Sequence, residues 1–171
     1  MREGGPVPAP PGHVQFCHHR PEHCVSAGGA GFRLSRHRFA LLDRVNRYVN
    51  GRMIYVTDPE LYRQADFWML AAPWGDCEDF ALTKRMLLMR AGFPPNALRL
   101  TLVEGGGQGL HLVLTAVTDR GDFILDNQHN RVLLWSDPRL VSYNWLSRTS
   151  GRDPSEWVEI TNTPRRGWRG W

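Results

Sequence analysis

The first half of the chain carries apolar residues at helical spacing in two places. Between Arg38 and Val49 an apolar residue recurs at every third or fourth position, which puts these residues on one face of a helix. They are Phe39, Leu42, Val45 and Val49. A second run of good helix formers begins after Trp74-Gly75-Asp76 and ends at Gly92-Phe93-Pro94-Pro95. Between the two runs, Asp58-Pro59-Glu60 predicts a short helical turn with Asp58 as its cap.

The second half of the chain changes to the patterns that are typical of strands. Turns rich in Gly, Asp or Asn separate four short runs of β-favouring residues. These runs cover residues 98–103, 110–117, 123–125 and 132–135. Because the helices come first and a meander of strands follows, we predict an α+β domain with the helices packed on an antiparallel sheet.

Length and composition indicate one domain with a sizeable core. Of the 171 residues, 42% are apolar and 22% are charged, which is close to the average for globular proteins. The longest apolar run, residues 67–74, is far shorter than the ~18 residues of a membrane-spanning helix, so we expect no stable membrane insertion. Residues 1–13 predict a flexible leader and residues 163–171 a flexible basic tail, which leaves 14–162 as the domain.

The net charge of +4 belongs mostly to the tail. Arg165, Arg166 and Arg169 carry three of these charges, which leaves +1 for residues 1–164. An excess of positive charge that is confined to one terminus is weak support for a nucleic-acid partner, and we predict no such partner.

Cys17 and Cys24 lie close together in the sequence, on either side of Pro21 and several polar residues that favour a tight loop. A disulfide between them would imply an oxidising compartment. Free thiols are one alternative. A zinc site is another, but its histidines lack the usual ligand spacing. These histidines are His18, His19 and His23. We favour the disulfide.

Three residues further along the chain combine the groups that nucleophilic catalysis needs. Cys77 opens the second predicted helix, where the helix dipole and the unpaired N–H groups stabilise a thiolate. His111 begins one predicted strand and Asp126 ends the next. Each residue alone has an ordinary structural interpretation, as a buried thiol, a half-buried imidazole or a turn residue. Together they supply a nucleophile, a base and a group that orients the base.

The pairing of His111 with Asp126 depends on the register of the hairpin. A turn made of residues 118–121 places Asp126 opposite Val113, diagonally from His111 on the same face of the sheet. A two-residue loop at Arg120-Gly121 would separate the two side chains by four positions. The sequence leaves both registers open.

The segment around Cys77 resembles the bacterial transglutaminase-like cysteine peptidases, whose best-known branch is the LapG-type periplasmic protease. The resemblance covers roughly residues 14–160 and keeps the order and spacing of the motifs. The matching residues are Trp74-Gly75-Asp76-Cys77-Glu78-Asp79-Phe80-Ala81, Lys84, Leu88, Gly92, His111-Leu112-Val113-Leu114 and Gly121-Asp122-Phe123-Ile124-Leu125-Asp126-Asn127.

This resemblance implies a papain-like, transglutaminase-like fold and a role for each member of the triad. In such an active site, Cys77 is the nucleophile, His111 is the base and Asp126 orients His111. Trp74 and the Cys77 N–H are weaker candidates for holding the oxyanion.

Acidic residues flank the predicted nucleophile on both sides. Asp76, Glu78 and Asp79 would raise the pKa of a neighbouring thiol, because like charge disfavours the thiolate. In the simplest interpretation they only stabilise the start of the helix. Three carboxylates also suit calcium, whose charge would cancel that effect. LapG-type relatives depend on calcium through acids of this motif, so the resemblance implies a calcium site at these three residues.

We therefore predict a cysteine peptidase that acts on a protein or peptide substrate through an acyl-enzyme, without an organic cofactor. A transglutaminase-like amine acyl-transferase and a catalytically idle calcium-responsive binding module are the alternatives. The resemblance adds cell-surface adhesins as substrates and an inner-membrane receptor as regulator. It also favours the periplasm, although residues 1–13 lack the apolar core of a secretory signal.

Overall fold

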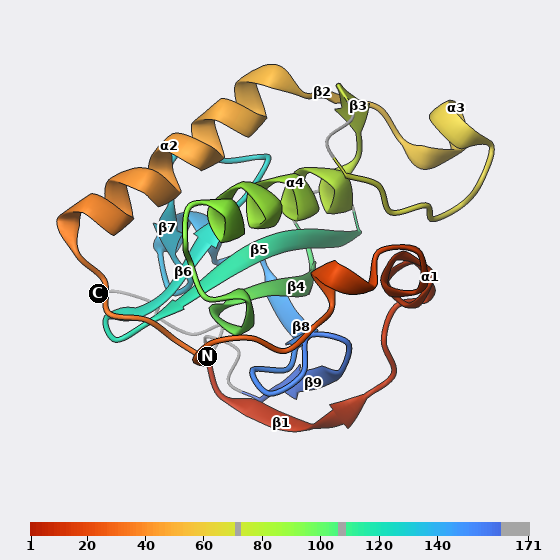
Figure 1. The fold of residues 1–171 in the computed structure, drawn as a ribbon. Coiled ribbons are helices and arrows are strands. Elements are labelled where there is room, and N and C mark those ends of the chain that lie inside the picture. The colour runs from red at the N-terminus through yellow and green to blue at the C-terminus, as the bar shows by residue number, and fades with distance from the viewer. Residues whose placement is uncertain (71–72, 106–108, 162–171) are drawn as a thin grey trace, which may run out of the picture.

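Within the residues that the computed structural model describes, 1–70, 73–105 and 109–161, seven strands form one antiparallel sheet (Figure 1). Their order across the sheet is β1-β9-β8-β4-β5-β6-β7. The strands are β1 (Glu3–Val7), β4 (Leu98–Glu104), β5 (Leu110–Thr118), β6 (Gly121–Leu125), β7 (Leu133–Leu134), β8 (Asn144–Thr149) and β9 (Trp157–Ile160). A separate parallel pair joins β2 (Ile54–Tyr55) to β3 (Trp74–Gly75).

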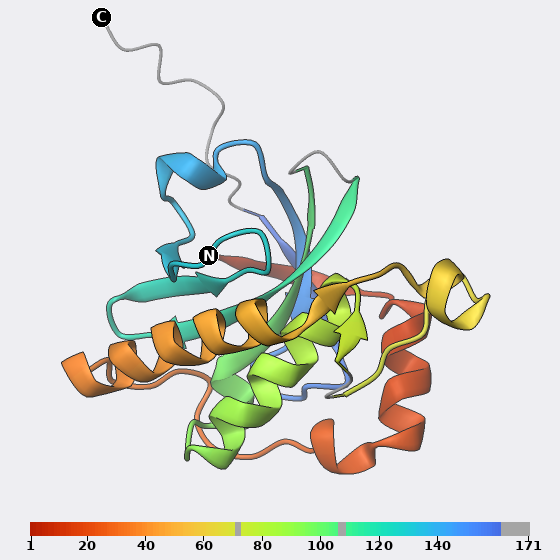
Figure 2. The same ribbon diagram turned by 90° about the horizontal axis from the view of Figure 1, so that it is seen from above.

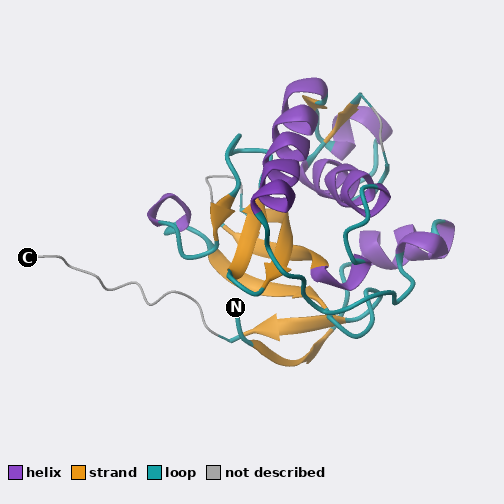
Figure 3. Cartoon of the chain, turned by 60° about the vertical axis from the view of Figure 1, so that its left-hand side comes forward, coloured by secondary structure: helices purple, strands orange, loops and turns teal. Residues whose placement is uncertain are grey.

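The long helices lie on one face of this sheet (Figures 2 and 3). Helix α4 lies along β5, and α2 contacts α4. The helices are α1 (Pro11–His19), α2 (Arg36–Arg52), α3 (Asp58–Tyr62) and α4 (Cys77–Arg90), with 3-10 turns at η1 (Pro21–His23), η2 (Pro95–Ala97) and η3 (Pro138–Leu140). No helix in the described part of the chain is long and apolar enough to cross a membrane. The predicted α+β architecture with an antiparallel sheet is confirmed.

Helix α2 is longer than its apolar spacing predicted. It starts after Ser35, whose hydroxyl accepts the N–H of Arg38 at 3.1 Å and so caps the helix. Its fully buried positions are Leu42, Val49 and a polar residue, Asn46. Burial of Asn46 is tolerated because its side-chain amide donates to the carbonyl of His129 at 2.7 Å.

The predicted turn at Asp58 is helix α3, but Asp58 does not cap it. Thr57 precedes the helix, and its N–H and hydroxyl donate to the Glu60 carboxylate at 3.1 and 2.7 Å. Asp58 is instead the first helical residue and is fully buried. The prediction of Asp58 as the cap was therefore wrong, and its carboxylate is available for other contacts.

The prediction of a flexible leader at residues 1–13 is wrong. Strand β1 pairs with β9, with Val7 opposite Trp157, and α1 begins at Pro11. An edge strand tolerates proline, so Pro6 does not prevent the pairing. Glu3 also accepts from the guanidinium of Arg148 at 3.2 Å. Residues 163–171, the predicted tail, lie outside the described residues.

Buried apolar side chains gather in two clusters, and β5 contributes to both. Leu112 and Leu114 belong to the cluster that includes Leu82 and Leu88 of α4. Val113 between them belongs to the second cluster. This alternation is what a central strand with two covered faces requires. The second cluster also includes residues of η3, of the loop after it, and of β8 and β9: Leu140, Tyr143, Trp145 and Ile160.

Cys17 and Cys24 form a disulfide, with 2.01 Å between the sulfur atoms and 5.6 Å between the Cα atoms. The bond ties the last part of α1 to the end of η1. The predicted disulfide is present, and the zinc alternative at this position is wrong because both thiols are consumed. Cys77 is a free cysteine.

Candidate active site

Cys77 is the first residue of α4 and is partly exposed. Its Sγ receives the N–H of Leu112 at 3.4 Å, which brings the sulfur against the start of β5. The thiol donates to Oε2 of Glu78 at 3.1 Å. Burial raises the pKa of the Cys77 thiol well above its ordinary value, and the nearby Glu78 adds to the rise.

His111 and Asp126 are brought together by the hairpin of β5 and β6. Thr118 pairs with Gly121 and Leu114 with Leu125, so the register is the one that puts Asp126 opposite Val113. Nε2 of His111 lies 2.9 Å from Oδ1 of Asp126, and both side chains are almost completely buried. The predicted contact between these two residues is confirmed.

The hydrogen bond to Asp126 determines which nitrogen of His111 remains available. Nε2 donates to the carboxylate, whereas Nδ1 is buried and has no hydrogen-bond partner among the described residues. Leu112, the next residue, contacts the sulfur of Cys77. Cys77 and His111 therefore approach the same end of the fold, where α4 and β5 both begin (Figure 1), although Nδ1 makes no hydrogen bond to the sulfur among the described residues.

Asp126 is held in its charged form by several donors. Tyr143 donates its hydroxyl to Oδ2 at 2.7 Å, and the N–H of Gln128 donates to Oδ1 at 2.9 Å. Burial alone would raise the pKa of Asp126, but hydrogen bonds from His111, Tyr143 and Gln128 outweigh it and lower the pKa. The backbone carbonyl of Asp126 accepts from the Asn50 amide at 2.9 Å, which anchors the loop to α2.

A cluster of buried acids lies beside the thiol. Asp58, Asp76 and Asp79 each contribute a carboxylate oxygen, and these oxygens lie within 4.8 Å of one another. Each of the three has a buried oxygen with no hydrogen-bond partner in the described structure. Burial raises the pKa of Asp58 to about 6 and that of Asp79 to about 8. Crowded carboxylates that each have one oxygen without a partner suit a hard divalent cation.

Glu78 is placed differently from the other two acids of the predicted trio. Its carboxyl group contacts the Cys77 thiol and forms a second group with Asp58 and Asp66. Burial, together with the carboxylate of Asp76, raises the pKa of Glu78 to about 9. The structure thus unites Asp76 and Asp79 with Asp58, and it leaves Glu78 between the sulfur and the other acids.

The sequence profile of the bacterial transglutaminase-like cysteine proteinase family, BTLCP, matches residues 3–165. The chain belongs to this family. A search of curated proteins found no match.

Solved structures of LapG from Legionella pneumophila are similar to this chain over part of its length. The calcium-bound form is 28% identical, with a TM-score of 0.54, over 64% of this chain and 63% of LapG. Another LapG structure and an EGTA-treated one are each 25% identical, with TM-scores of 0.57, over 71% of this chain and 68% and 67% of theirs. The alignments thus span about two thirds of the LapG chain. They confirm the transglutaminase-like fold predicted from the motifs.

Several residues of this proteinase-family site had no clear signal in the sequence. Tyr143 follows an irregular loop, and Asn50 comes just after Val49, the last apolar residue of the predicted helix. Asp58 was interpreted as a helix cap because it precedes Pro59, and nothing in the sequence indicated that it lies beside Asp76 and Asp79. Trp74 lies on β3 opposite Ile54 and is 48% exposed, so its role at the oxyanion stays a prediction.

Proposed function

We propose that the chain is a cysteine peptidase in which Cys77 is the nucleophile, His111 the general base and Asp126 the group that orients His111. The observation that carries this proposal is the hydrogen bond between His111 Nε2 and Asp126, which leaves Nδ1 of His111 without a partner, one residue before the N–H of Leu112 that contacts the Cys77 sulfur. Family membership supports the same assignment.

In this mechanism the proton of the Cys77 thiol passes to Nδ1 of His111, and the thiolate attacks the carbonyl carbon of a peptide bond. The C–N bond breaks, the amine leaves with the proton from His111, and a thioester remains on Cys77. His111 then takes a proton from water, whose oxygen attacks the carbonyl carbon of the thioester. The C–S bond breaks, the acid leaves, and the Cys77 sulfur takes the proton back from His111. Asp126 stays ionised throughout and stabilises the imidazolium.

The proposed oxyanion donor is the N–H of Cys77. A residue in the first turn of a helix has an amide without an intrahelical acceptor, and that amide is available to a developing negative charge. Trp74 is three residues earlier and largely exposed, so it is better placed to contact the substrate chain than to hold a buried oxygen.

We further propose that Asp58, Asp76 and Asp79 hold a calcium ion. Three buried carboxylate oxygens without partners fit this cation, and two of these acids were expected in the site from the motif. When bound, calcium supplies positive charge beside Cys77 and so opposes the acids that disfavour the thiolate. A calcium-bound structure of LapG supports the idea.

The proposed location is the periplasm. The disulfide between Cys17 and Cys24 supports an oxidising compartment. Surface adhesins as substrates and an inner-membrane receptor as regulator rest on the family resemblance alone. If intact cells are alkylated before lysis and mass spectrometry then finds both cysteines as free thiols, the support from the disulfide disappears.

The catalytic proposal is tested by alkylation with an iodoacetamide probe under non-reducing conditions, across pH and with or without calcium. Wild type, Cys77→Ala and His111→Ala are compared. Fast labelling at neutral pH that needs both Cys77 and His111 is expected, and calcium should increase it. Slow labelling that His111→Ala leaves unchanged would contradict the proposal. The mass of the product from a model peptide then separates hydrolysis, which cuts the peptide, from transfer, which adds an amine.

A further inference from the structure

The charges of the domain are distributed unevenly along the chain. Residues 33–52 hold six arginines and one acid, which gives this segment a net charge of +5. Residues 1–164 as a whole have a net charge of only +1, so the remainder of the domain is acidic overall. The basic segment includes the whole of α2. Positive charge is therefore concentrated on one element of the fold.

Helix α2 has one buried face and one exposed face. Leu42, Asn46 and Val49 are buried, and the helix contacts α4 and β6. At 3.6 residues per turn, positions 36, 40, 44, 47 and 51 form the opposite face. All five of these residues are exposed, and so is Arg52 at the end of the helix. Figure 1 shows α2 at the periphery of the molecule, where this face can be approached from outside.

The exposed face of α2 carries four positive charges and no acid. We call it the basic face, and it consists of Arg36, Ala40, Arg44, Arg47, Gly51 and Arg52. Within the described residues, Arg47 pairs with Asp43 at the border of this face, whereas Arg36, Arg44 and Arg52 form no ion pair. Ala40 has a small side chain and Gly51 has open space beside it, so a flat partner can come close to the helix.

The arginines are spread along the helix and do not converge on one point. Helix α2 has 17 residues, so the basic face is about 25 Å long at 1.5 Å per residue. A single small anion can contact only neighbouring guanidinium groups on such a face. A surface with many anionic groups can contact all of them at once, so an extended anionic surface is the partner that fits.

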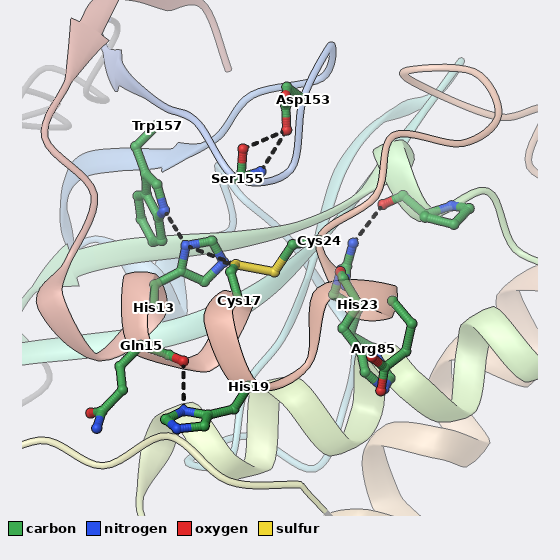
Figure 4. The surroundings of a disulfide bond; sticks show 12 residues. His13, Gln15, Cys17, His19, His23, Cys24, Arg85, Asp153, Ser155 and Trp157 are labelled. Carbon is green, nitrogen blue, oxygen red and sulfur yellow. Dashed lines mark hydrogen bonds and ion pairs between the residues drawn. A yellow bond between two sulfur atoms is a disulfide. The ribbon is translucent and has the colours of Figure 1, made fainter.

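The Cys17–Cys24 disulfide favours a lipid surface over a nucleic acid (Figure 4). A disulfide is typical of oxidising compartments, where membranes present phosphate headgroups and nucleic acids are scarce. A helix with arginines on its outer face can lie parallel to a bilayer, with the guanidinium groups at the level of the phosphates. Because the apolar face of α2 is buried in the protein, such binding is electrostatic and involves no insertion.

We propose that the basic face of α2 binds the surface of a bilayer that contains anionic phospholipids such as phosphatidylglycerol. The guanidinium groups of Arg36, Arg44 and Arg52 contact the lipid phosphates directly. The basic face does not include Cys77 or His111, so the proposal is independent of the proposed peptidase activity.

The test measures co-sedimentation of the full chain with vesicles of phosphatidylglycerol mixed with phosphatidylcholine, and with vesicles of phosphatidylcholine alone. We expect binding to the anionic vesicles at low salt and none to the neutral vesicles. Binding should weaken as the ionic strength rises through about 0.15 M, where charges are screened beyond about 8 Å. Absence of binding to the anionic vesicles, or binding that salt does not weaken, would overturn the proposal.

Two triple variants with the same change in net charge locate the binding surface. Replacing Arg36, Arg44 and Arg52 together by glutamine should weaken vesicle binding on the order of 100-fold, since each arginine contributes about fivefold. The control replaces three exposed arginines outside α2 by glutamine and should weaken binding less than about threefold. These arginines are Arg20, Arg90 and Arg152. Equal losses in the two variants, or unchanged binding in the α2 variant, would overturn the proposal.

Two further measurements keep the outcome decisive. If circular dichroism shows that the triple α2 variant is unfolded, Arg44→Gln alone is measured, and it should weaken binding about fivefold. A fluorescent duplex oligonucleotide is titrated at the same ionic strength as the vesicles. If the oligonucleotide binds more tightly than the anionic vesicles and the α2 variant loses this binding, a nucleic acid is the partner and the lipid proposal is wrong.

Discussion

Cys77 and the Cys17–Cys24 disulfide place sulfur in different surroundings. Around Cys77 the neighbours include the carboxyl groups of Glu78 and Asp76, and both raise the pKa of the thiol. Around the disulfide the ring of His13 packs against the Cys17 sulfur, with Nε2 at 3.5 Å, and the two sulfur atoms are bonded to each other. Sulfur is therefore a free thiol that needs activation at one site and a cross-link within the fold at the other.

This difference indicates what each region requires from outside. In the proposed mechanism, the thiol of Cys77 becomes a nucleophile with His111 as its base and with a cation to oppose the acids. The disulfide needs no such partner, because both of its sulfur atoms are already bonded. A change at one region is therefore expected to leave the other unaffected.

The largest expected effect is the loss of the base. His111→Ala should lower kcat/KM at least about 1,000-fold, because Cys77 then loses its proposed general base and the pKa of its thiol is already raised by burial. Kinetics on a model peptide measure the loss. His37→Ala, an exposed histidine of α2, is the matched control and should keep full activity. Retention of more than about a tenth of the activity by His111→Ala would argue against the triad.

The next prediction concerns the buried lysine of α4, the helix that begins at Cys77. Lys84 is completely buried, its Nζ has no hydrogen-bond partner in the described structure, and burial lowers its pKa to about 7. Between pH 7 and the ordinary lysine pKa, the unfolded chain binds a proton that the folded chain does not, so wild-type stability should rise with pH in this window.

Lys84→Met should remove that slope. The variant should be more stable than wild type by several kcal/mol below pH 7, and the difference should shrink as pH approaches 10. Urea unfolding at several pH values measures it. A constant difference across the whole range would mean that the burial of Lys84 does not couple to its protonation.

Calcium should stabilise the protein through the acids, with no effect on the disulfide region. At 100 times the dissociation constant a bound ion adds about 2.7 kcal/mol to the free energy of unfolding. Asp79→Asn should abolish this gain while the calcium-free protein stays folded, because an asparagine oxygen can still accept from the N–H of Met69. Asp137→Asn, far from the cluster in sequence and bonded to Arg139, should respond to calcium like wild type. Equal calcium responses in all three proteins would exclude the proposed ligands.

The disulfide should matter for stability and leave catalysis unchanged. Replacing Cys17 and Cys24 by serine opens a short loop and should lower the free energy of unfolding by about 2 to 3 kcal/mol. The kcat and KM values for a model peptide should stay within about twofold of wild type, since a stability change far from the chemistry alters the folded fraction rather than the reacting groups. A large fall in kcat would show that the two regions are coupled.

The sequence predicted those features that depend on neighbours along the chain. Cys77 at a helix start and the hairpin that joins His111 to Asp126 follow from local patterns, although two registers were open until the structure showed Thr118 opposite Gly121. Features that depend on distant partners were missed. Strand β1 looked like a flexible leader because its stability comes from pairing with β9 at the other end of the chain. Asp58 looked like a cap because its companions lie some 20 residues later.

Tyr143 is such a missed residue, and it provides the smallest of these effects. Its hydroxyl donates to Asp126 at 2.7 Å, and this bond helps to lower the pKa of that carboxyl group. Tyr143→Phe should lower kcat by about threefold to tenfold with little change in KM, because Asp126 keeps its bonds to His111 and to the Gln128 amide.

The sign of the accompanying pH effect follows from the same bond. Without the tyrosine donor the pKa of Asp126 rises, so this carboxylate is protonated at a higher pH and activity on the acid side should be lost earlier. Tyr48→Phe, on the exposed face of α2, is the control and should leave both kcat and the pH profile unchanged. A fall in kcat without a shift of the acidic side of the pH–activity profile would mean that Tyr143 contributes through packing alone. With the shift, the hydroxyl is a positioning group that keeps Asp126 charged beneath His111.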